Sequence, residues 1–264
     1  MLSVAVVTVT YNAEAGLRKT IDSVLAQSYG KLEYWIMDGE SSDATIAIAE
    51  GYKSEFEKKK IPYQIISQAD NGIFDAMNRS LSFIHSDYVI FLNAEDFFAS
   101  GEVIESIFRN RLHTNSDVIY GNYYAYSKNK RKRYVSRSAS ELPKHMICTH
   151  QAIFTKTALL RERNYDIQYK MTADYDFYLY MYLQRKVFEK IDIEIVYFDI
   201  AGASQRNAKL AQMERVRLLI ENGCIDSREA ERQRKKIKYI CLRKKLISRL
   251  PDFIRFHSYE EIIQ

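Results

Sequence analysis

Proline and glycine are scarce in this chain, with 3 prolines and 9 glycines among its 264 residues. Long disordered linkers are rich in such residues, so the composition excludes a string of loosely joined modules. The hydrophobic share of 47% and the charged share of 28% are those of an ordinary globular protein. The length suffices for one large α/β core with an appendage, or for two small domains.

Cysteines are equally few. Cys148, Cys224 and Cys241 are odd in number and lack CxxC spacing, which excludes a disulfide scaffold and a zinc site and fits a reducing compartment. The N-terminal stretch LSVAVVTVTYN has neither a basic flank nor a cleavage site, so it predicts a buried strand and not a signal peptide. No run approaches the roughly 18 apolar residues of a membrane span. We therefore expect a cytoplasmic protein.

The net charge of +5 is unevenly distributed along the chain. Residues 205–264 contain 15 Lys and Arg against 8 Asp and Glu, a net +7, which leaves −2 for residues 1–204. This change in net charge along the chain predicts a main domain over 1–204 and a basic helical tail over 205–264.

The tail predicts two helices, over residues 207–221 and 227–249. In the second, apolar side chains fall near one face, amid many basic residues. Two interpretations stay open: peripheral contact with an anionic membrane at its inner face, or packing on the main domain with the basic face in solvent. The apolar residues are Ile237, Ile240, Cys241 and Ile247.

Strands and helices alternate in the first half of the chain. Such alternation favours an α/β fold with a mostly parallel central sheet and right-handed crossovers. After residue 120, a hairpin, a helix and a last strand are predicted on the same sheet. The predicted strands are 4–9, 33–37, 62–67, 88–92, 118–120, 123–127, 133–138 and 193–200; the predicted helices start at Leu17, run from Ser41–Asp43 through about Glu57, and cover 75–86 and 172–184.

Polar residues follow three of these strands at the point where each strand ends. Tyr11-Asn12 follows the first strand, Asp38 the second, and Asn93–Asp96 the fourth. In parallel sheets the ligand binds beyond the carboxyl ends of the strands. The three clusters therefore predict one site.

The segment Asn93-Ala94-Glu95-Asp96 carries two neighbouring carboxylates, which repel unless a cation or a donor lies between them. Mg²⁺ or Mn²⁺ held by one or two carboxylates and substrate phosphates would meet that need. The alternative is a pair of acids that complements a helix dipole. Asp38 likewise fits either a contact with a base or ribose hydroxyl, or a turn before Gly39.

Three further segments carry polar side chains. The Asp70–Asn78 segment is rich in hydrogen-bonding groups and opens a helix. Asp174 and Asp176 stand at a helix start, and residues two apart do not share a helix face, so one of them should point into the site. A carboxylate there suits a general base toward a hydroxyl, or simply a helix cap. His150 is either structural or part of the acceptor side.

Taken in order, these segments resemble a family 2 glycosyltransferase of the GT-A fold, of the type that builds bacterial surface polysaccharides such as colanic acid and O-antigen. The matching stretches span residues 4 to about 204. They are Val7–Asn12, Ile36–Asp43, Asp70–Asn78, Phe91–Asp96, Thr149–Phe154 and Ala173–Tyr175.

The resemblance implies a role for each matching residue. Tyr11 and Asp38 would hold the nucleotide base and Glu95 the ribose, Asp96 would bind a divalent metal, and Asp174 would be the catalytic base. His150 and Asp176 would lie on the acceptor side. The remaining donor-binding residues would be Thr10, Asn12, Asp70, Asn78 and Asn93.

The implied function is inverting transfer of a sugar from a nucleotide diphosphate to a hydroxyl of a glycan or lipid-linked acceptor. Two acids that the family usually carries are replaced by Ala94 and Ala173. A non-catalytic nucleotide-sugar-binding partner of an assembly complex is therefore the alternative. A dinucleotide enzyme would need a glycine-rich turn after the first strand, which is absent, and no nucleic-acid partner is expected.

Overall fold

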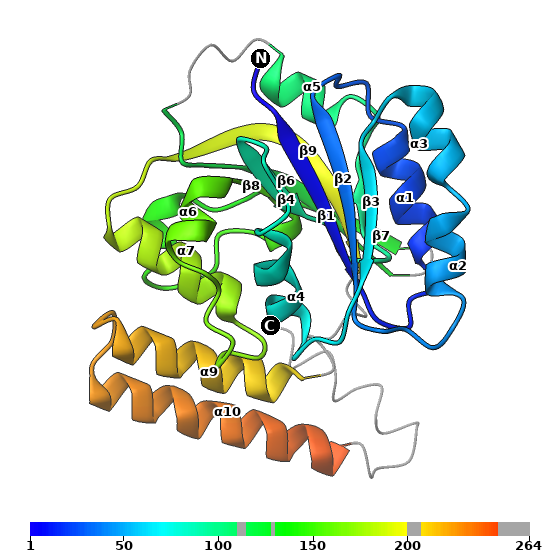
Figure 1. Ribbon diagram of the computed structural model, residues 1–264. Coiled ribbons are helices and arrows are strands. Elements are labelled where there is room, and N and C mark those ends of the chain that lie inside the picture. Colours follow the sequence, from blue (N-terminus) through cyan, green and yellow to red (C-terminus); the bar gives the residue numbers. More distant parts are fainter. Residues whose placement is uncertain (110–114, 128–129, 200–206, 248–264) are drawn as a thin grey trace. The chain divides into compact units, whose positions relative to one another are not determined.

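The computed structural model describes residues 1–109, 115–127, 130–199 and 207–247. The chain divides into two compact units, residues 1–202 and 203–264. The first unit is built on one sheet with helices on both faces (Figure 1). The predicted α/β fold class is confirmed.

The first half of the sheet is parallel, in the order β3-β2-β1-β4. Strand β1 is buried at every position, which accounts for its unbroken run of apolar and threonine residues. The register places Thr10 beside Asp38 and Asp38 beside Ser67, at the carboxyl ends of three neighbouring strands. The strands are β1 Val4–Thr10, β2 Leu32–Asp38, β3 Tyr63–Ser67 and β4 Tyr88–Phe91; the helices are α1 Leu17–Leu25, α2 Thr45–Glu50, α3 Lys53–Lys59 and α4 Ile73–Ser80.

The second half continues as β8-β6-β9-β5 and mixes directions. Strand β8 is antiparallel to both β4 and β6, whereas β9 runs parallel to β6. Antiparallel pairing thus extends beyond the one predicted hairpin. The elements are β5 Phe97–Phe98, α5 Val103–Phe108, β6 Val118–Ser127, β7 Lys130–Tyr134, the 3₁₀ turns η1 Ala139–Glu141 and η2 His150–Ala152, β8 Ile153–Lys156, α6 Thr157–Glu162, α7 Ala173–Leu183 and β9 Phe188–Asp199.

Two helices differ from their predicted bounds. The helix predicted to reach Glu57 is two helices, α2 and α3, interrupted at Gly51-Tyr52. Phe56 of α3 is completely buried, with its ring centre 4.3 Å from that of Tyr63. Helix α4 begins at Ile73, directly after Gly72 reverses the chain with φ of 112°, and ends at Ser80 instead of residue 86.

The hairpin is also shifted from its predicted position. Its second strand, β7, covers Lys130–Tyr134 and not 133–138, and stacking of Tyr123 on Tyr134 fixes this register. Ser136 is not in the strand: its backbone N–H donates to Asn122 Oδ1 at 3.0 Å. The last strand begins earlier than predicted, at Phe188, and residues 128, 129 and 200 lie outside the described residues.

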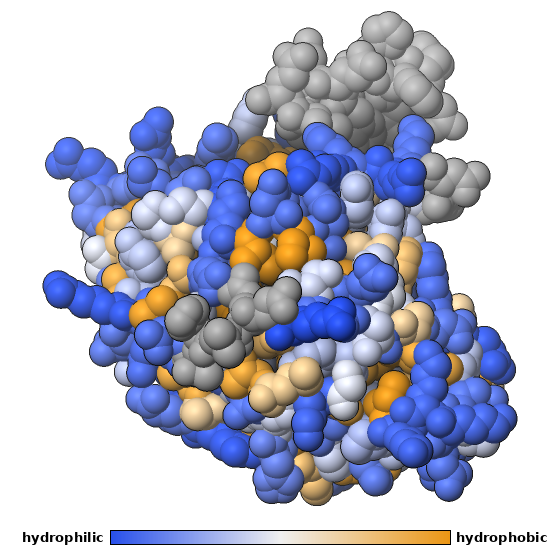
Figure 2. Space-filling view, turned by 90° about the horizontal axis from the view of Figure 1, so that it is seen from above, coloured by the Kyte–Doolittle hydropathy of each residue, from blue (hydrophilic) through white to orange (hydrophobic). Residues whose placement is uncertain are grey.

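The apolar side chains of the first unit are concentrated in its interior. Large residues such as Tyr34, Tyr88, Phe108 and Phe154 are fully buried. On the face seen in Figure 2, hydrophobic residues form small separate patches among hydrophilic ones. All three cysteines are free thiols, as predicted, and Cys148 is buried.

The second unit contains α9 (Ala208–Glu221) and α10 (Ser227–Ile247). The two helices share an apolar cluster made of residues from both. Ile237 and Cys241, two of the residues predicted on one apolar face, belong to this cluster, and contact of α10 with a membrane or with the main domain stays a prediction. The cluster comprises Met213, Val216, Ile220, Ile225, Ala230, Ile237 and Cys241. Among the described residues no helix is long and apolar enough to cross a bilayer.

Candidate active site

A buried carboxylate, Asp38, organises the carboxyl ends of the first three strands. The hydroxyls of Thr10, Ser41 and Ser67 donate to it at 2.9, 2.5 and 2.8 Å, and the Ser41 N–H donates at 2.9 Å. Only 2% of Asp38 is exposed. These four hydrogen bonds hold the loops after β1, β2 and β3 together. Contact between Asp38 and a nucleotide base stays a prediction.

Asn12 connects the loop after β1 to the loop after β2. Its backbone has φ of 48°, a left-handed conformation that asparagine tolerates better than most residues. Its N–H donates to Ser41 Oγ at 2.8 Å, and its Oδ1 accepts from the Ser42 N–H at 2.9 Å. The preceding residue, Tyr11, is left 69% exposed.

Tyr11 and Asp70 border the same surface, on either side of Gly39. A Cβ atom at Gly39 would lie 2.7 Å from Asp70 Oδ2 and 3.5 Å from Tyr11 Cδ2. A side chain at Gly39 would therefore fill the space between them. This exposed ring beside a carboxylate is the part of the site best suited to a base or ribose.

Glu95 lies in a strained turn after β4, with φ of 84°. Its N–H donates to Thr20 Oγ1 at 3.0 Å, and its carbonyl accepts from the Tyr126 hydroxyl at 2.6 Å. A Cβ atom at Gly16, just before α1, would collide with the Glu95 side chain. Residues from α1 and β6 thus hold the Glu95 turn in its left-handed conformation.

Asp96 is 3% exposed and fixed by two donors. Gln151 Nε2 donates to its Oδ2 at 2.7 Å, and the Asp199 N–H donates to its Oδ1 at 2.8 Å. Burial raises the pKa of Asp96 to about 7, although these hydrogen bonds and nearby His150 act in the opposite direction. Neither oxygen accepts more than one of these bonds, so lone pairs remain on both.

Asp174 and Asp176, on the first turn of α7, have different surroundings. Asp174 Oδ2 lies 3.3 Å from His150 Nδ1, and His150 Nε2 lies 3.4 Å from Asn93 Nδ2. Asp176 is buried and forms an ion pair of 2.7 Å with Arg163. Asp174 is therefore connected to the Asn93–Asp96 segment, whereas Asp176 is tied to the loop before α7.

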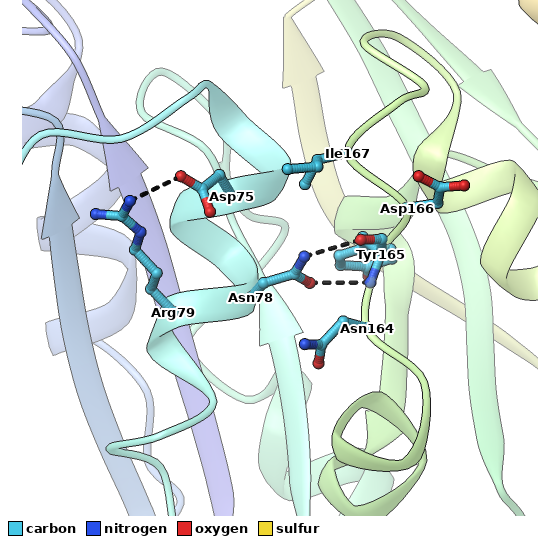
Figure 3. Close-up of a pocket in the computed structure, with 7 residues that line it drawn as sticks. All are labelled: Asp75, Asn78, Arg79, Asn164, Tyr165, Asp166 and Ile167. Atoms are coloured by element: carbon cyan, nitrogen blue, oxygen red, sulfur yellow. Dashed lines mark hydrogen bonds and ion pairs between the residues drawn. The ribbon is translucent and has the colours of Figure 1, made fainter.

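Asn78 uses both ends of its amide to hold a neighbouring loop. Its Nδ2 donates to the Tyr165 carbonyl at 2.8 Å, and its Oδ1 accepts from the Tyr165 N–H at 2.9 Å (Figure 3). A cavity of about 440 Å³ lies between α4 and this loop. Its lining is mostly polar: Asp75, Asn78, Arg79, Asn164, Tyr165, Asp166 and Ile167.

Gln151 and Asp199 were not predicted as site residues. Gln151 follows His150 directly in a segment that we had singled out, but a glutamine carries no signal of its own. Asp199 ends β9, which runs parallel to β6, so the rule that placed the other polar clusters at strand ends could have found it. Because the strand was predicted to end at residue 200, Asp199 was not recognised as a polar residue at a strand end.

The site was tested for its fit to a divalent metal. The described residues contain no group of three or more His, Cys, Asp and Glu side chains that could hold an ion. Asp96 supplies one carboxylate, and the nearby Asn93 Oδ1 is a buried oxygen without a hydrogen-bond partner in the described structure. Mg²⁺ commonly binds through one or two carboxylates plus phosphates and water. Asp96 fits a cation bound in this way.

Comparison with solved structures establishes the fold. Staphylococcus aureus TarS (residues 1–349, in complex with UDP) matches with a TM-score of 0.64 and 17% identity, covering 89% of this chain and 70% of TarS. The mannosyltransferase PcManGT from Pyrobaculum calidifontis, in complex with GDP-Man and Mn²⁺, matches with a TM-score of 0.65 and 13% identity, covering 86% and 65%. The fold is thus the GT-A fold of glycosyltransferases, as predicted.

Sequence comparison defines the family. Residues 5–192 match Glycosyl transferase family 2, and the chain belongs to this family. A PGL/p-HBAD biosynthesis glycosyltransferase from Mycobacterium bovis is 31% identical over 171 residues. The match covers 64% of this chain and 65% of the relative, somewhat less than two thirds of its length.

Proposed function

We propose that this protein transfers a sugar from a nucleotide-diphosphate sugar to a hydroxyl group of an acceptor, with inversion at the anomeric carbon. The observation that carries the proposal is the pairing of two carboxylates at one sheet edge. Asp96 is buried and anchored by Gln151 and Asp199, and Asp174 is joined to the same segment through His150. Family membership supports the same activity.

The donor would bind across the carboxyl ends of β1, β2 and β4. Tyr11 offers an exposed ring for a base, and Asp70 lies beside it. Thr10 and Asn12 would act mainly by positioning, because their side chains are already bonded within the protein. Glu95, whose turn is fixed at both ends, would contact the ribose, and Asn93 Oδ1 would accept from a donor hydroxyl.

Asp96 would hold Mn²⁺ or Mg²⁺ together with the diphosphate. When bound, the cation would offset the negative charge that develops on the leaving group. The 13%-identical PcManGT was solved with Mn²⁺. Ala94 cannot add a second carboxylate, so the binding of metal and donor should depend strongly on each other.

Asp174 would act as the general base. The acceptor oxygen attacks the anomeric carbon while the bond to the diphosphate oxygen breaks, and the nucleoside diphosphate leaves with the electron pair. The hydroxyl proton passes to the Asp174 carboxylate. One displacement on one face inverts the configuration and needs no protein nucleophile. His150 and Asp176 would lie on the acceptor side, with Asp176 fixing the loop before α7 through Arg163.

We infer that the acceptor is a glycan or lipid-linked glycan of a bacterial surface polymer. The mycobacterial relative is a glycosyltransferase of PGL/p-HBAD biosynthesis. The resemblance to colanic-acid and O-antigen transferases points to polysaccharide, so both classes of acceptor belong in an assay panel. The cavity between α4 and the loop at Tyr165 offers hydrogen-bonding side chains, among them Asn164 and Asp166, to a sugar.

Contact with the inner face of an anionic membrane is part of the proposal, through a face of α10 other than the one first predicted. Tyr239 and Leu242 are 63% and 58% exposed, and their spacing of three residues places them on one side of the helix. Lys235 and Lys238, one turn earlier, are also exposed. A basic helix with exposed apolar side chains fits a cytoplasmic protein held at an anionic bilayer.

A non-catalytic nucleotide-sugar-binding protein is the second candidate, favoured by the lack, among the described residues, of any group of three or more side chains that could hold a metal. One experiment separates the two. The full chain is incubated with UDP-, GDP- and dTDP-sugars, with and without Mn²⁺, and release of nucleoside diphosphate is measured with water and with surface glycans as acceptors. Turnover with any donor supports the enzyme. Saturable donor binding with no turnover across the panel supports the binding protein.

A further inference from the structure

The short 3₁₀ turn η2 contacts both carboxylates of the candidate site. From two adjacent residues, Gln151 Nε2 donates to Asp96 at 2.7 Å and His150 Nδ1 lies 3.3 Å from Asp174. Asp96 follows β4 and Asp174 begins α7, so no local stretch of backbone sets the distance between them. The turn joins these two elements.

The turn is itself rigidly held. The Ala152 N–H closes it on the Thr149 carbonyl at 3.0 Å, and strand β8 follows at once, paired with β4 and β6. Gln151 and Ala152 are 1% and 0% exposed. The Thr149 hydroxyl donates to Gln151 Oε1, which leaves Nε2 as the end of the amide that faces Asp96.

The chemistry of its neighbours assigns the tautomer of His150. The Asn93 amide turns its nitrogen, which can only donate, toward Nε2 at 3.4 Å, so this contact is a hydrogen bond when Nε2 accepts. In the tautomer with an accepting Nε2 the proton lies on Nδ1, and the acceptor that faces Nδ1 among the described residues is Asp174 Oδ2, 3.3 Å away. The hydrogen bonds run in one direction, from Asn93 to His150 and from His150 to Asp174.

We propose that His150 and Gln151 are positioning residues that hold Asp174 and Asp96 at the separation the transfer requires, with His150 in the Nδ1–H tautomer. This inference rests on the proposed function. His150 directs Asp174 Oδ2, while Oδ1 accepts from the Tyr175 N–H at 2.8 Å and keeps a lone pair for the acceptor hydroxyl. Gln151 orients Asp96, so that its remaining lone pairs face the ligand. Neither residue needs to touch the reacting atoms.

The tautomer is tested without any substrate. Full-length protein labelled with ¹⁵N-histidine is examined by long-range ¹H–¹⁵N NMR, with His150 assigned by its loss in His150→Asn. The Nδ1–H pattern is expected in wild type, and Asp174→Ala should change the Nδ1 resonance. An Nε2–H pattern, or a His150 spectrum unaffected by Asp174→Ala, overturns the assignment even if the protein proves to be an active transferase.

The positioning role is tested by kinetics with the donor that the panel identifies. His150→Ala should lower kcat by 10–100-fold, the usual cost of losing a group that orients another, with little change in the donor KM. His150→Asn should recover part of this loss, because its amide can replace Nδ1–H as a donor to Asp174. His85→Asn, at an exposed histidine, is the matched control and should be neutral.

Gln151 is tested through metal binding. Gln151→Leu removes the donor to Asp96 and should weaken Mn²⁺ binding in the presence of nucleoside diphosphate by 10–100-fold, measured by electron paramagnetic resonance. Folding is checked by circular dichroism, and only variants with the wild-type spectrum are scored. Wild-type kcat in folded His150→Ala, or wild-type Mn²⁺ affinity in folded Gln151→Leu, overturns the proposal for that residue. If no donor turns over, the proposed function fails, whereas the NMR result still decides the geometry.

Discussion

The backbone N–H of Asp199 donates to Oδ1 of Asp96 at 2.8 Å, across 103 residues of sequence. This bond joins the end of β9 to the turn after β4 and places a second carboxylate near the first. The negative charge of Asp199 adds to the burial that raises the pKa of Asp96. The surroundings of Asp96 therefore favour its protonated form over its ionised form.

Asp96→Asn should make the protein more stable at neutral and alkaline pH. The folded-state pKa of about 7 exceeds the usual value near 3.9, so the folded state retains a proton that the unfolded state loses. Wild-type stability should fall as pH rises from about 4 to about 7, and the variant should avoid this loss. The measurement is the thermal midpoint at pH 5 and pH 8. A wild-type-to-variant difference that is equal at both pH values contradicts the prediction.

Asp174→Asn should reduce turnover by about 10²–10⁴-fold, the usual contribution of a general base, while donor affinity stays near wild type. Asparagine keeps the shape of the side chain and can still accept a hydrogen bond from His150, but it cannot take the acceptor proton. Steady-state rates and donor titration by calorimetry provide the two readouts. Near-normal turnover would remove Asp174 from this role.

Asp176→Asn should affect the stability of the protein and not its turnover. The variant leaves the partly buried Arg163 without its carboxylate partner, which lies at 2.7 Å. Breaking a buried ion pair by removing one partner typically costs about 3–5 kcal/mol. We expect a clear drop in the free energy of unfolding in urea. If Asp176→Asn lost turnover but kept its stability, Asp176 would belong to the catalytic machinery.

Gly16→Ala should disturb the Glu95 turn. The added methyl group would collide with the Glu95 side chain, and overpacking of this kind costs about 1–3 kcal/mol. Donor affinity should fall as well, because Glu95 is the proposed ribose contact. Gly30→Ala is the matched control, since a Cβ atom there meets nothing within 4 Å. Equal effects of the two substitutions on stability and donor binding would argue against this prediction.

Replacing Tyr239 and Leu242 with serine should weaken binding to vesicles that contain anionic phosphatidylglycerol. Each Lys or Arg near such a surface contributes about 1 kcal/mol, so binding should also weaken as salt increases. Leu210→Ser, at a residue 44% exposed on α9, is the control. Cosedimentation of the full chain with neutral and anionic vesicles measures the effect. Wild-type binding by the double variant would exclude this face.

The parallel half of the fold could be predicted because the sequence features that indicate it lie within or next to each strand. The buried run of β1 and the polar residues after β1, β2 and β4 indicate the sheet and its binding edge. The interruption between α2 and α3 could not be predicted, because it depends on where Phe56 packs. The site residues in these motifs could be proposed, but not their partners, since Gln151 lies 55 residues after Asp96 and Asp199 lies 103 residues after it.

The two hydrogen bonds between Asn78 and Tyr165 have a consequence for how two ligands of the site affect each other's binding. They fasten α4, on the proposed donor side, to the loop that leads into α7, and so to Asp174. A ligand that shifts either segment must carry the other along or break both bonds. If donor and acceptor bind at these two segments, as we propose, their affinities are thermodynamically linked, and each substrate changes the affinity for the other by the same factor.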